Sequence, residues 1–294
     1  MSANSGLKKL LEKGEFVIIA GIGIPRGADF KPLEERYKLL EKKVNAFFIP
    51  DNPGANVHLL GLAAAVHIEK RGGETVLELN CRDRNRIAIQ SSILGAAALG
   101  IPNLLFSTGD HQTLGNFRGA KRVYDVDLTQ AIQIARGMRD EKKFSNGEEV
   151  AQPPGIFIGA EVNPFADPLE FRPALMAKKV EAGADFVQTR AVFDLERFGK
   201  WIKLVRQQES LQKTPILAGI IPLVSVEQAK ALQEAPGMMV PDSLIQRLES
   251  SGKPEEEGIK IAKEILTQVK KTEGVRGIVL HAGGMESLVS DLIK

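Results

Sequence analysis

Residues 75–99 have the sequence TVLELNCRDRNRIAIQSSILGAAAL, and this stretch contains the unit from which the whole fold can be predicted. TVLEL (75–79) is a short apolar run, typical of a strand that is buried on both faces. A polar turn follows, and residues 84–99 then have the apolar spacing of a helix. The stretch therefore predicts one strand–turn–helix unit of an α/β protein.

Seven further apolar runs of strand length recur along the chain, with helical patterns between them. The strand-like runs are FVIIAGI (16–22), AFFI (46–49), NLLFST (103–108), IFIGAEV (156–162), DFVQT (185–189), PILAGII (215–221) and GIVLHA (277–282). The helical patterns occupy 7–13, 32–44, 56–70, 84–99, 128–139, 171–182, 195–208, 226–234, 242–250, 255–270 and 284–293. Eight such strands predict a (β/α)8 TIM barrel, with a doubly wound open sheet as the alternative. Because no linker divides the chain, we expect a single barrel domain over 1–294 that begins with a short helix.

Composition excludes several classes of protein. The 294 residues include 39 Lys and Arg against 37 Asp and Glu, a formal charge of +2 that argues against a nucleic-acid binder with a wholly basic surface. A single cysteine, Cys81, excludes an intramolecular disulfide and a multi-cysteine metal site, so no metal is expected. The first residues have no apolar signal core, and no run of 18 apolar residues occurs. We therefore expect a cytoplasmic protein with no membrane partner.

Two turns after predicted strands carry groups suited to chemistry, because the active site of such a barrel lies at the carboxyl ends of its strands. CRDRNR (81–86) holds three arginines, which suit phosphate oxygens or an Arg–Asp network that ties the loop to its helix. STGDH (107–111) places Gly109 where a flat ligand could approach the backbone, and Asp110 where a carboxylate could meet a pterin, a flavin or a cation. Capping of the loop is the alternative role for Asp110.

Other cations are expected to converge on the same rim, which suits a ligand with a pyrophosphate. They are Arg118, Lys121, Lys178, Lys179 and Arg190. Cys81 is interpreted as a packing residue, because no histidine neighbours it in sequence, and His281 as a structural histidine.

These motifs, taken in order, resemble those of the methylenetetrahydrofolate reductases over nearly the whole chain. The matching segments are IPRGAD (24–29), DNP (51–53), NCRDRNR (80–86) with Gln90 and Ser91, GIPN (100–103), TGD (108–110), YDVDL (124–128), EVNP (161–164) and KKVEAGADF (178–186). The resemblance implies a barrel that holds FAD at the carboxyl ends of its strands. It also implies hydride transfer from the reduced flavin to 5,10-methylenetetrahydrofolate, which yields 5-methyltetrahydrofolate.

The resemblance further implies roles for individual residues. Asp110 corresponds to the family aspartate beside flavin and pterin, as a catalytic and substrate-binding group, and Arg190 stands at a folate-binding position. The flavin contacts implied are Thr108, Gly109, Asp110, Tyr124, Asp125, Asn163 and Lys179, the last at the phosphates. In the reaction the five-membered ring of the folate opens to an N5 iminium cation. That opening needs a proton on N10 and a negative charge near the cation.

The sequence departs from the family pattern at four positions. Gly21 replaces the glutamate that usually donates the proton, and Pro50 replaces a threonine. Arg190 replaces a glutamine, and Val226 replaces an aromatic residue that stacks on nicotinamide.

The loss of the glutamate leaves the proton donor open, with Glu78, His111 and Glu161 as candidates. The loss of the aromatic residue favours a reduced partner protein, such as an iron–sulfur or electron-transfer subunit, over NADH or NADPH. Resemblance also suggests a homo-oligomer. The main hypothesis is flavin-dependent folate reduction. One alternative is a flavin-bearing electron-relay or structural subunit that reduces no folate, and another is a flavin-free pterin-binding methyltransferase barrel.

Overall fold

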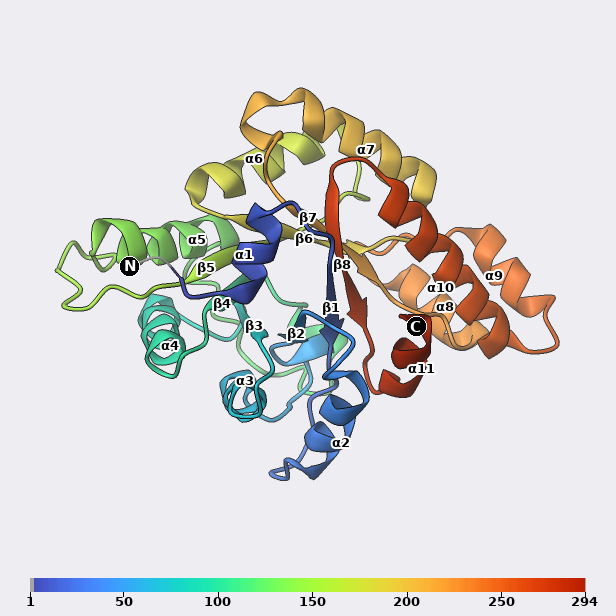
Figure 1. The fold of residues 1–294 in the computed structure, drawn as a ribbon, viewed down its shortest axis with the longest axis horizontal. Coiled ribbons are helices and arrows are strands. Elements are labelled where there is room, and N and C mark those ends of the chain that lie inside the picture. The colour runs from blue at the N-terminus through green and yellow to red at the C-terminus, as the bar shows by residue number, and fades with distance from the viewer. Residues whose placement is uncertain (1–2, 294) are drawn as a thin grey trace.

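Eight parallel strands close into a barrel in the order β1 to β8 in the computed structural model, which describes residues 3–293 (Figure 1). The strands are β1 (Val17–Gly21), β2 (Ala46–Ile49), β3 (Thr75–Asn80), β4 (Asn103–Ser107), β5 (Phe157–Val162), β6 (Phe186–Ala191), β7 (Ile216–Ile220) and β8 (Val275–His281). The last strand pairs with the first, with Gly21 in register with His281. The predicted TIM barrel is confirmed, and the open sheet is excluded.

Helices connect consecutive strands and surround the barrel (Figure 1). They are α1 (Gly6–Glu12), α2 (Lys31–Leu40), α3 (Gly61–Glu69), α4 (Arg86–Ala98), α5 (Leu128–Arg136), α6 (Arg172–Ala182), α7 (Leu195–Gln207), α8 (Val226–Glu234), α9 (Asp242–Glu249), α10 (Pro254–Lys271) and α11 (Glu286–Leu292). Short turns of 3-10 helix lie at Pro53–Ala55, Gln112–Leu114, Leu169–Phe171 and Glu209–Leu211, and a π-helical turn at Gly137–Glu141 follows α5.

One predicted helix was wrong over its first turn. Residues 56–60 form a loop, and α3 begins only at Gly61. In this loop the backbone N–H of His58 donates to Asn52 Oδ1 at 3.1 Å, and the Asn56 amide donates to the Gly54 carbonyl at 3.0 Å. Because such local side-chain bonds compete with helical ones, the helix starts after them.

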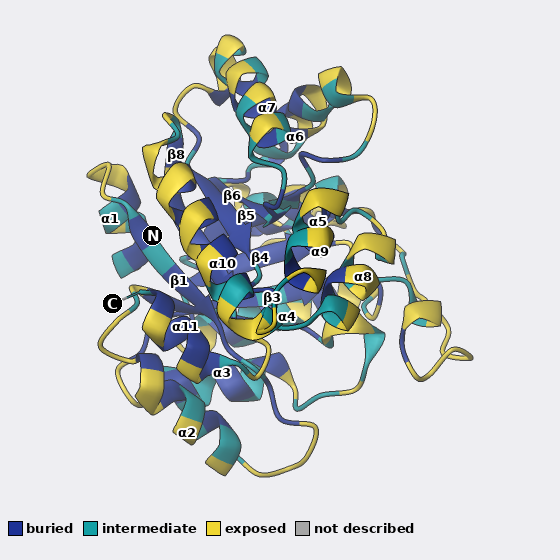
Figure 2. Cartoon of the chain, turned by 90° about the vertical axis from the view of Figure 1, so that its right-hand side faces the viewer, coloured by how far each residue is buried: buried dark blue, intermediate teal, exposed yellow. Residues whose placement is uncertain are grey.

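The barrel interior consists of alternate residues of each strand. Apolar side chains such as Ile19, Phe48, Val76 and Leu105 form one buried cluster inside it. Figure 2 shows buried strands at the centre, with the exposed residues on the outer faces of the helices. The hydrophobic groups removed from water inside the barrel and beneath the helices provide the main driving force for this arrangement.

Helix α1 closes one end of the barrel. Its Leu7 and Leu11 join the interior cluster and are fully or nearly fully buried. Glu74 accepts hydrogen bonds from the Leu7 backbone at 2.9 Å and from the Asn103 amide at 2.8 Å. Ser5 caps the helix and also bonds to Asn103. Among residues 3–293, this leaves the carboxyl ends of the strands as the open end of the barrel interior.

Candidate functional site

A cavity of about 220 Å³ opens at the carboxyl ends of the strands. Its polar lining comes from the ends of β2 to β6 and of β8, together with the loops that follow them. These polar residues are Asp51, Asn52, Glu78, Ser107, Asp110, Glu161, Gln188, Thr189, Arg190 and His281. The cavity therefore has the position expected for the active site of this fold.

The CRDRNR turn forms the Arg–Asp network rather than an open anion site. Arg84 pairs with Asp51, and Arg82 Nε donates to Asp83 Oδ1 at 2.8 Å. Arg86 Nε donates to Oδ2 of Asp125 at 2.9 Å. Each guanidinium thus already has a carboxylate partner, and the turn is held rigidly beneath the mouth.

Asp110 lies at the mouth, as predicted. Gly109, just before it, has a φ of +79°, and a Cβ there would come within 3.1 Å of side-chain atoms of Asn80 and Arg82. Glycine is thus required by the backbone itself at this turn. The Asp110 carboxylate accepts from the Gly54 N–H at 3.1 Å, and its backbone carbonyl accepts from Arg82 at 2.9 Å.

Arg190 joins two of the carboxylates that line the cavity. Its Nε lies 2.6 Å from Glu161 Oε1 and its Nη1 lies 3.6 Å from Asp110 Oδ1. Burial disfavours the charge, but the two carboxylates outweigh it, so the pKa of Arg190 is raised. Arg190 therefore both pairs with Glu161 and faces the space where a ligand would bind.

Glu78 stands at an inward-facing position of β3, two residues beyond Val76 of the apolar cluster. Its carboxylate accepts from the Asp51 backbone N–H at 2.9 Å. Burial raises the pKa of Glu78 to about 8; the charges of Asp51 and Glu161 raise this pKa further, and the hydrogen bond from the Asp51 backbone opposes the shift. The acid form of Glu78 therefore predominates at neutral pH.

His281 fills the space beside Gly21. A Cβ added at Gly21 would lie 3.2 Å from Nδ1 of His281. The imidazole meets the Phe48 ring edge to face, with centroids 5.6 Å apart. Burial, with the nearby Arg190 charge, lowers the pKa of His281 to about 4, so the ring is neutral at physiological pH. His281 thus both packs structurally and faces the cavity.

The other predicted contact residues are distributed around the rim. Thr108 is exposed, Tyr124 is half-buried with its N–H bonded to the Cys81 carbonyl at 3.2 Å, and Asp125 is held by Arg86. Asn163 accepts from the Phe165 N–H at 2.9 Å. Of the predicted flavin and folate contacts, Gly109, Asp110 and Arg190 line the cavity itself, and so do the proton-donor candidates Glu78 and Glu161.

A pair of cations on α6 lies next to the mouth. Lys179 Nζ donates to the Glu161 carbonyl at 2.6 Å, which leaves two of its N–H groups available. Arg172 lies seven residues earlier, on the same face of the helix, and its buried Nε has no hydrogen-bond partner in the described residues. Burial lowers the pKa of Lys179, and the Arg172 charge lowers it further. Sequence analysis missed Arg172, although the seven-residue spacing from Lys179 could have identified it.

Two other candidates lie outside this cavity. His111, in the loop after β4, bonds to Thr113 Oγ1 at 2.7 Å and to Arg122. Cys81 is buried, and burial raises its thiol pKa to about 12, so it is a packing residue as predicted.

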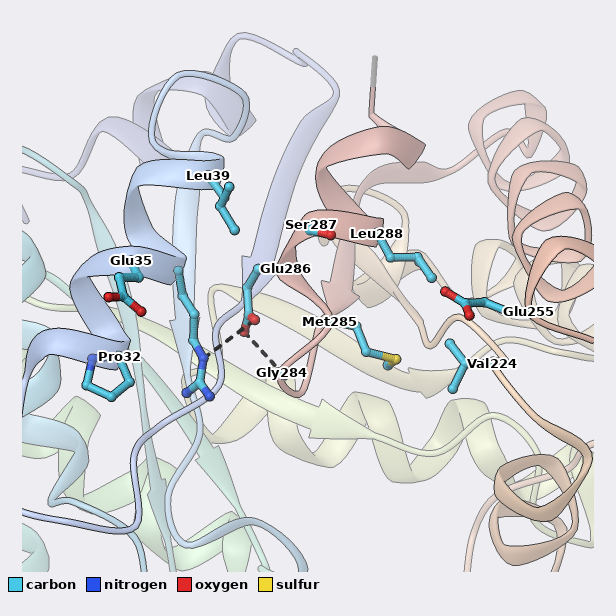
Figure 3. Close-up of a pocket in the computed structure, with 11 residues that line it drawn as sticks. Pro32, Glu35, Leu39, Val224, Glu255, Gly284, Met285, Glu286, Ser287 and Leu288 are labelled. Carbon is cyan, nitrogen blue, oxygen red and sulfur yellow. Dashed lines mark hydrogen bonds and ion pairs between the residues drawn. The ribbon is translucent and has the colours of Figure 1, made fainter.

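A second, outer cavity of about 520 Å³ lies between α2, α10 and α11 (Figure 3). Glu286, almost fully buried there, accepts from the Gly23 N–H at 2.8 Å and lies 3.6 Å from Arg36. Arg36 in turn donates to the Gly23 carbonyl at 2.6 Å. This cluster anchors the loop after β1 from outside the mouth.

Two further classes of site were sought within residues 3–293. No group of three His, Cys, Asp or Glu side chains there is placed to hold a metal ion. None of the helices in that range combines the length and apolarity needed to cross a membrane.

Comparison with known proteins identifies relatives of this chain. The family model described as methylenetetrahydrofolate reductase matches residues 7–293. Methylenetetrahydrofolate reductase 2 of Schizosaccharomyces pombe is 32% identical over 209 residues, which cover 69% of this chain and 32% of that protein. The match thus spans about a third of the length of this relative.

Two solved structures share the fold. A Clostridium thermocellum protein described as binding two copies of 5-methyl-5,6,7,8-tetrahydrofolic acid superposes with a TM-score of 0.70 and 12% identity, covering 98% of this chain and 99% of that one. A 2,3-dimethylmalate lyase superposes with a TM-score of 0.53 and 14% identity, covering 99% and 84%. At these identities the likeness establishes the barrel fold alone.

Proposed function

Because the chain belongs to the methylenetetrahydrofolate reductase family, we propose that it catalyses the flavin-dependent reduction of 5,10-methylenetetrahydrofolate to 5-methyltetrahydrofolate. The observation that carries this proposal is the family match over residues 7–293, which includes every strand that contributes to the mouth cavity. The Clostridium barrel of equal extent that binds 5-methyltetrahydrofolate also supports a folate ligand.

The residues around the mouth fit a flavin nucleotide. Lys179 and Arg172 provide a cation with free donors and a buried guanidinium nitrogen without a partner, which suits phosphate oxygens. Asn163 supplies an amide at the same rim, and Ser107 Oγ is buried without a hydrogen-bond partner in the described residues. When bound, the flavin supplies a hydride to the methylene carbon.

The chain's own residues would bind the pterin and stabilise positive charge. The Asp110 carboxylate lies 3.6 Å from Arg190, a long contact that leaves it able to interact with a cationic substrate. Glu161 balances the charge of Arg190, and so prevents Arg190 from neutralising Asp110 fully. The apolar floor beneath them, which includes Leu105 and Phe48, limits access of water.

An electron donor of protein type belongs to the same proposal. Val226, at the position of the usual stacking aromatic residue, is the first residue of α8 and packs against the hydrophobic core rather than lining the mouth cavity. Stacking of a nicotinamide therefore has no aromatic support there. We expect a reduced iron–sulfur or similar protein to be oxidised faster than NADH or NADPH, and the active form to be a homo-oligomer.

The experiment that tests the function uses the purified protein reconstituted with FAD under anaerobic conditions. Addition of 5-methyltetrahydrofolate should bleach the visible band of the flavin, because the reaction run in reverse returns the hydride to the ring. A yellow protein whose band does not bleach would point instead to an electron-relay subunit.

A flavin-free pterin-binding barrel is the second candidate. It is supported by one observation: the Clostridium structure that matches nearly the whole of this chain is described as binding two copies of 5-methyl-5,6,7,8-tetrahydrofolic acid. A protein that stays colourless after addition of FAD, yet binds 5-methyltetrahydrofolate in a titration, would establish this candidate and exclude the first.

A further inference from the structure

The strand-one end of the mouth holds no acid. Gly21 has no side chain, and the imidazole of His281 occupies the adjacent space. The carboxyl group that binds the backbone just after β1 is that of Glu286, which faces the outer cavity and is engaged by Gly23, Gly284 and Arg36 (Figure 3). A proton for the folate must therefore come from another strand.

Four carboxyl groups line the mouth cavity, and three of them have an arginine partner. Asp51 pairs with Arg84, while Glu161 and Asp110 share Arg190. Glu78 forms no ion pair within residues 3–293, and the Asp51 backbone N–H, at 2.9 Å, is its hydrogen-bond donor there. It is the carboxyl group least stabilised as an anion.

The register of the sheet places Glu78 near the vacant position. Gly21 is in register with Phe48, and Phe48 with Val76. Glu78 is the next inward-facing residue of β3 after Val76, and it lines the same cavity as Asp110 and His281. The side chain is half-buried, so it lies below the rim but can be reached from the cavity.

The charges around Glu78 keep it protonated until it is used. Burial raises its pKa, as do Asp51 from the loop after β2 and Glu161 from β5, while Arg190 from β6 is engaged by Glu161 and Asp110. His281 from β8 is neutral, since its pKa is lowered to about 4, and cannot serve as the acid. Glu78 therefore arrives at neutral pH as a carboxylic acid that faces the ligand space.

We propose that Glu78 is the general acid of folate ring opening, an inference that rests on the proposed function. The bond between the methylene carbon and N10 breaks, its electron pair goes to N10, and the proton of Glu78 goes to N10 as well. The products are an N5 iminium cation and the Glu78 carboxylate, so the total charge of the cavity is unchanged. The new carboxylate and cation attract each other, and water later returns a proton to Glu78.

The test compares Glu78→Gln with Glu69→Gln in the flavin-loaded protein. Glu69 is a matched control: burial raises its pKa too, but it lies on α3 outside the barrel, bonded to Thr75 at 2.7 Å. Reduction of methylenetetrahydrofolate by pre-reduced protein should slow by about 10² to 10⁴-fold in Glu78→Gln, the usual contribution of a general acid. Glu69→Gln should react at the wild-type rate.

A second readout separates proton donation from a structural role. Hydride return from 5-methyltetrahydrofolate to oxidised flavin needs no proton on N10, since N10 already carries one. The initial bleaching rate should therefore change less than about threefold in Glu78→Gln while the forward rate collapses. In the wild type the forward rate should fall above about pH 8, following the pKa of Glu78, and Glu78→Gln should lose this dependence.

Each outcome has a distinct meaning. Equal loss of the forward and reverse rates would overturn the proton-donor role in favour of a structural one, and a Glu78→Gln protein that matches the wild type would overturn it outright. In both cases the proposed function stands, because the wild type reacts. A wild-type protein that reacts with folate in neither direction would overturn the proposed function and this role together.

Discussion

The two ends of the barrel interior are built from the same strands but are completed in opposite ways. At the closed end, Glu74 accepts three hydrogen bonds, from Ser5, Leu7 and Asn103. At the open end, four residues further along the chain, Glu78 of β3 has a single backbone donor within 3.0 Å and a pKa of about 8. The same residue type, just before β3 and within it, is thus fully paired at one end and poorly stabilised at the other.

The difference separates structural from chemical roles. A buried polar group without partners costs folding free energy, so the closed end, where partners are provided, contributes to stability. The mouth keeps an unpaired acid, a buried Ser107 hydroxyl and cations with free donors, all of which a ligand could satisfy. Substitutions at the closed end should therefore leave the chemistry unchanged, whereas substitutions at the mouth should alter it.

The largest effect on stability is expected at the closed end. Leu7→Ala removes a completely buried side chain from the interior cluster and should lower the free energy of unfolding by about 2–5 kcal/mol, measured by denaturant titration. Leu10→Ala, a half-buried neighbour on the same helix, should cost clearly less. The flavin bleaching rate of the folded Leu7→Ala protein should equal that of the wild type. A changed rate would break the separation between the two ends.

The next largest effect on stability should appear in Glu78→Gln, as a gain rather than a loss. The folded protein holds the Glu78 proton to about pH 8, whereas the unfolded chain releases it near 4.5. Between these values the native state binds more protons, so wild-type stability falls as pH rises through this window. Glu78→Gln lacks this loss and should be the more stable protein at pH 8. The free energy of unfolding of Glu78→Gln minus that of the wild type should be larger at pH 8 than at pH 4 by roughly 2–4 kcal/mol.

Unfolding curves of both proteins at several pH values measure this difference. Parallel stability profiles would mean that Glu78 ionises normally, and the contrast with Glu74 would disappear.

Much of the fold was predictable because buried parallel strands leave unbroken apolar runs, and all eight were found. Asp127 and Ser225 cap α5 and α8, with their side chains accepting from the backbone N–H groups of Gln130 and Gln228. The loop at 56–60 was not predictable from periodicity. Its helical pattern was overridden by the hydrogen bond that Asn52 accepts from His58 and the one that Asn56 donates to Gly54, both of which depend on the turn before the helix.

The candidate site was predictable only in part. Asp110 and Arg190 follow strand ends, and position alone brings them to the mouth. The partners of the CRDRNR arginines include Asp51 and Asp125, more than 30 residues away, so sequence could not distinguish a network from an anion site. Glu78 did carry a signal, a charged residue at an inward position of an apolar strand, but its lack of a cation became visible only in three dimensions.

A smaller effect is expected at Arg190. Arg190→Met leaves Glu161 and Asp110 without their shared cation, which should cost about 1–3 kcal/mol, less than for a fully buried pair because the mouth is open to water. Adding Glu161→Gln should recover part of the loss. Unfolding of the two single variants and the double variant measures the coupling, and strictly additive losses would show that the pair contributes nothing.

The smallest effect tests whether His281 has taken the space of the missing strand-one side chain. Gly21→Ala introduces a Cβ 3.2 Å from Nδ1 and 3.3 Å from Cα of His281, so the free energy of unfolding should fall by about 1 kcal/mol. In a His281→Ala background, where only the backbone contact remains, the cost should fall by about half. Strictly additive changes in the free energy of unfolding would mean that the imidazole can move aside without cost and that an acid could be restored at position 21. Coupling between them would mean that the imidazole excludes a strand-one acid, which leaves Glu78 on β3 as the candidate proton donor.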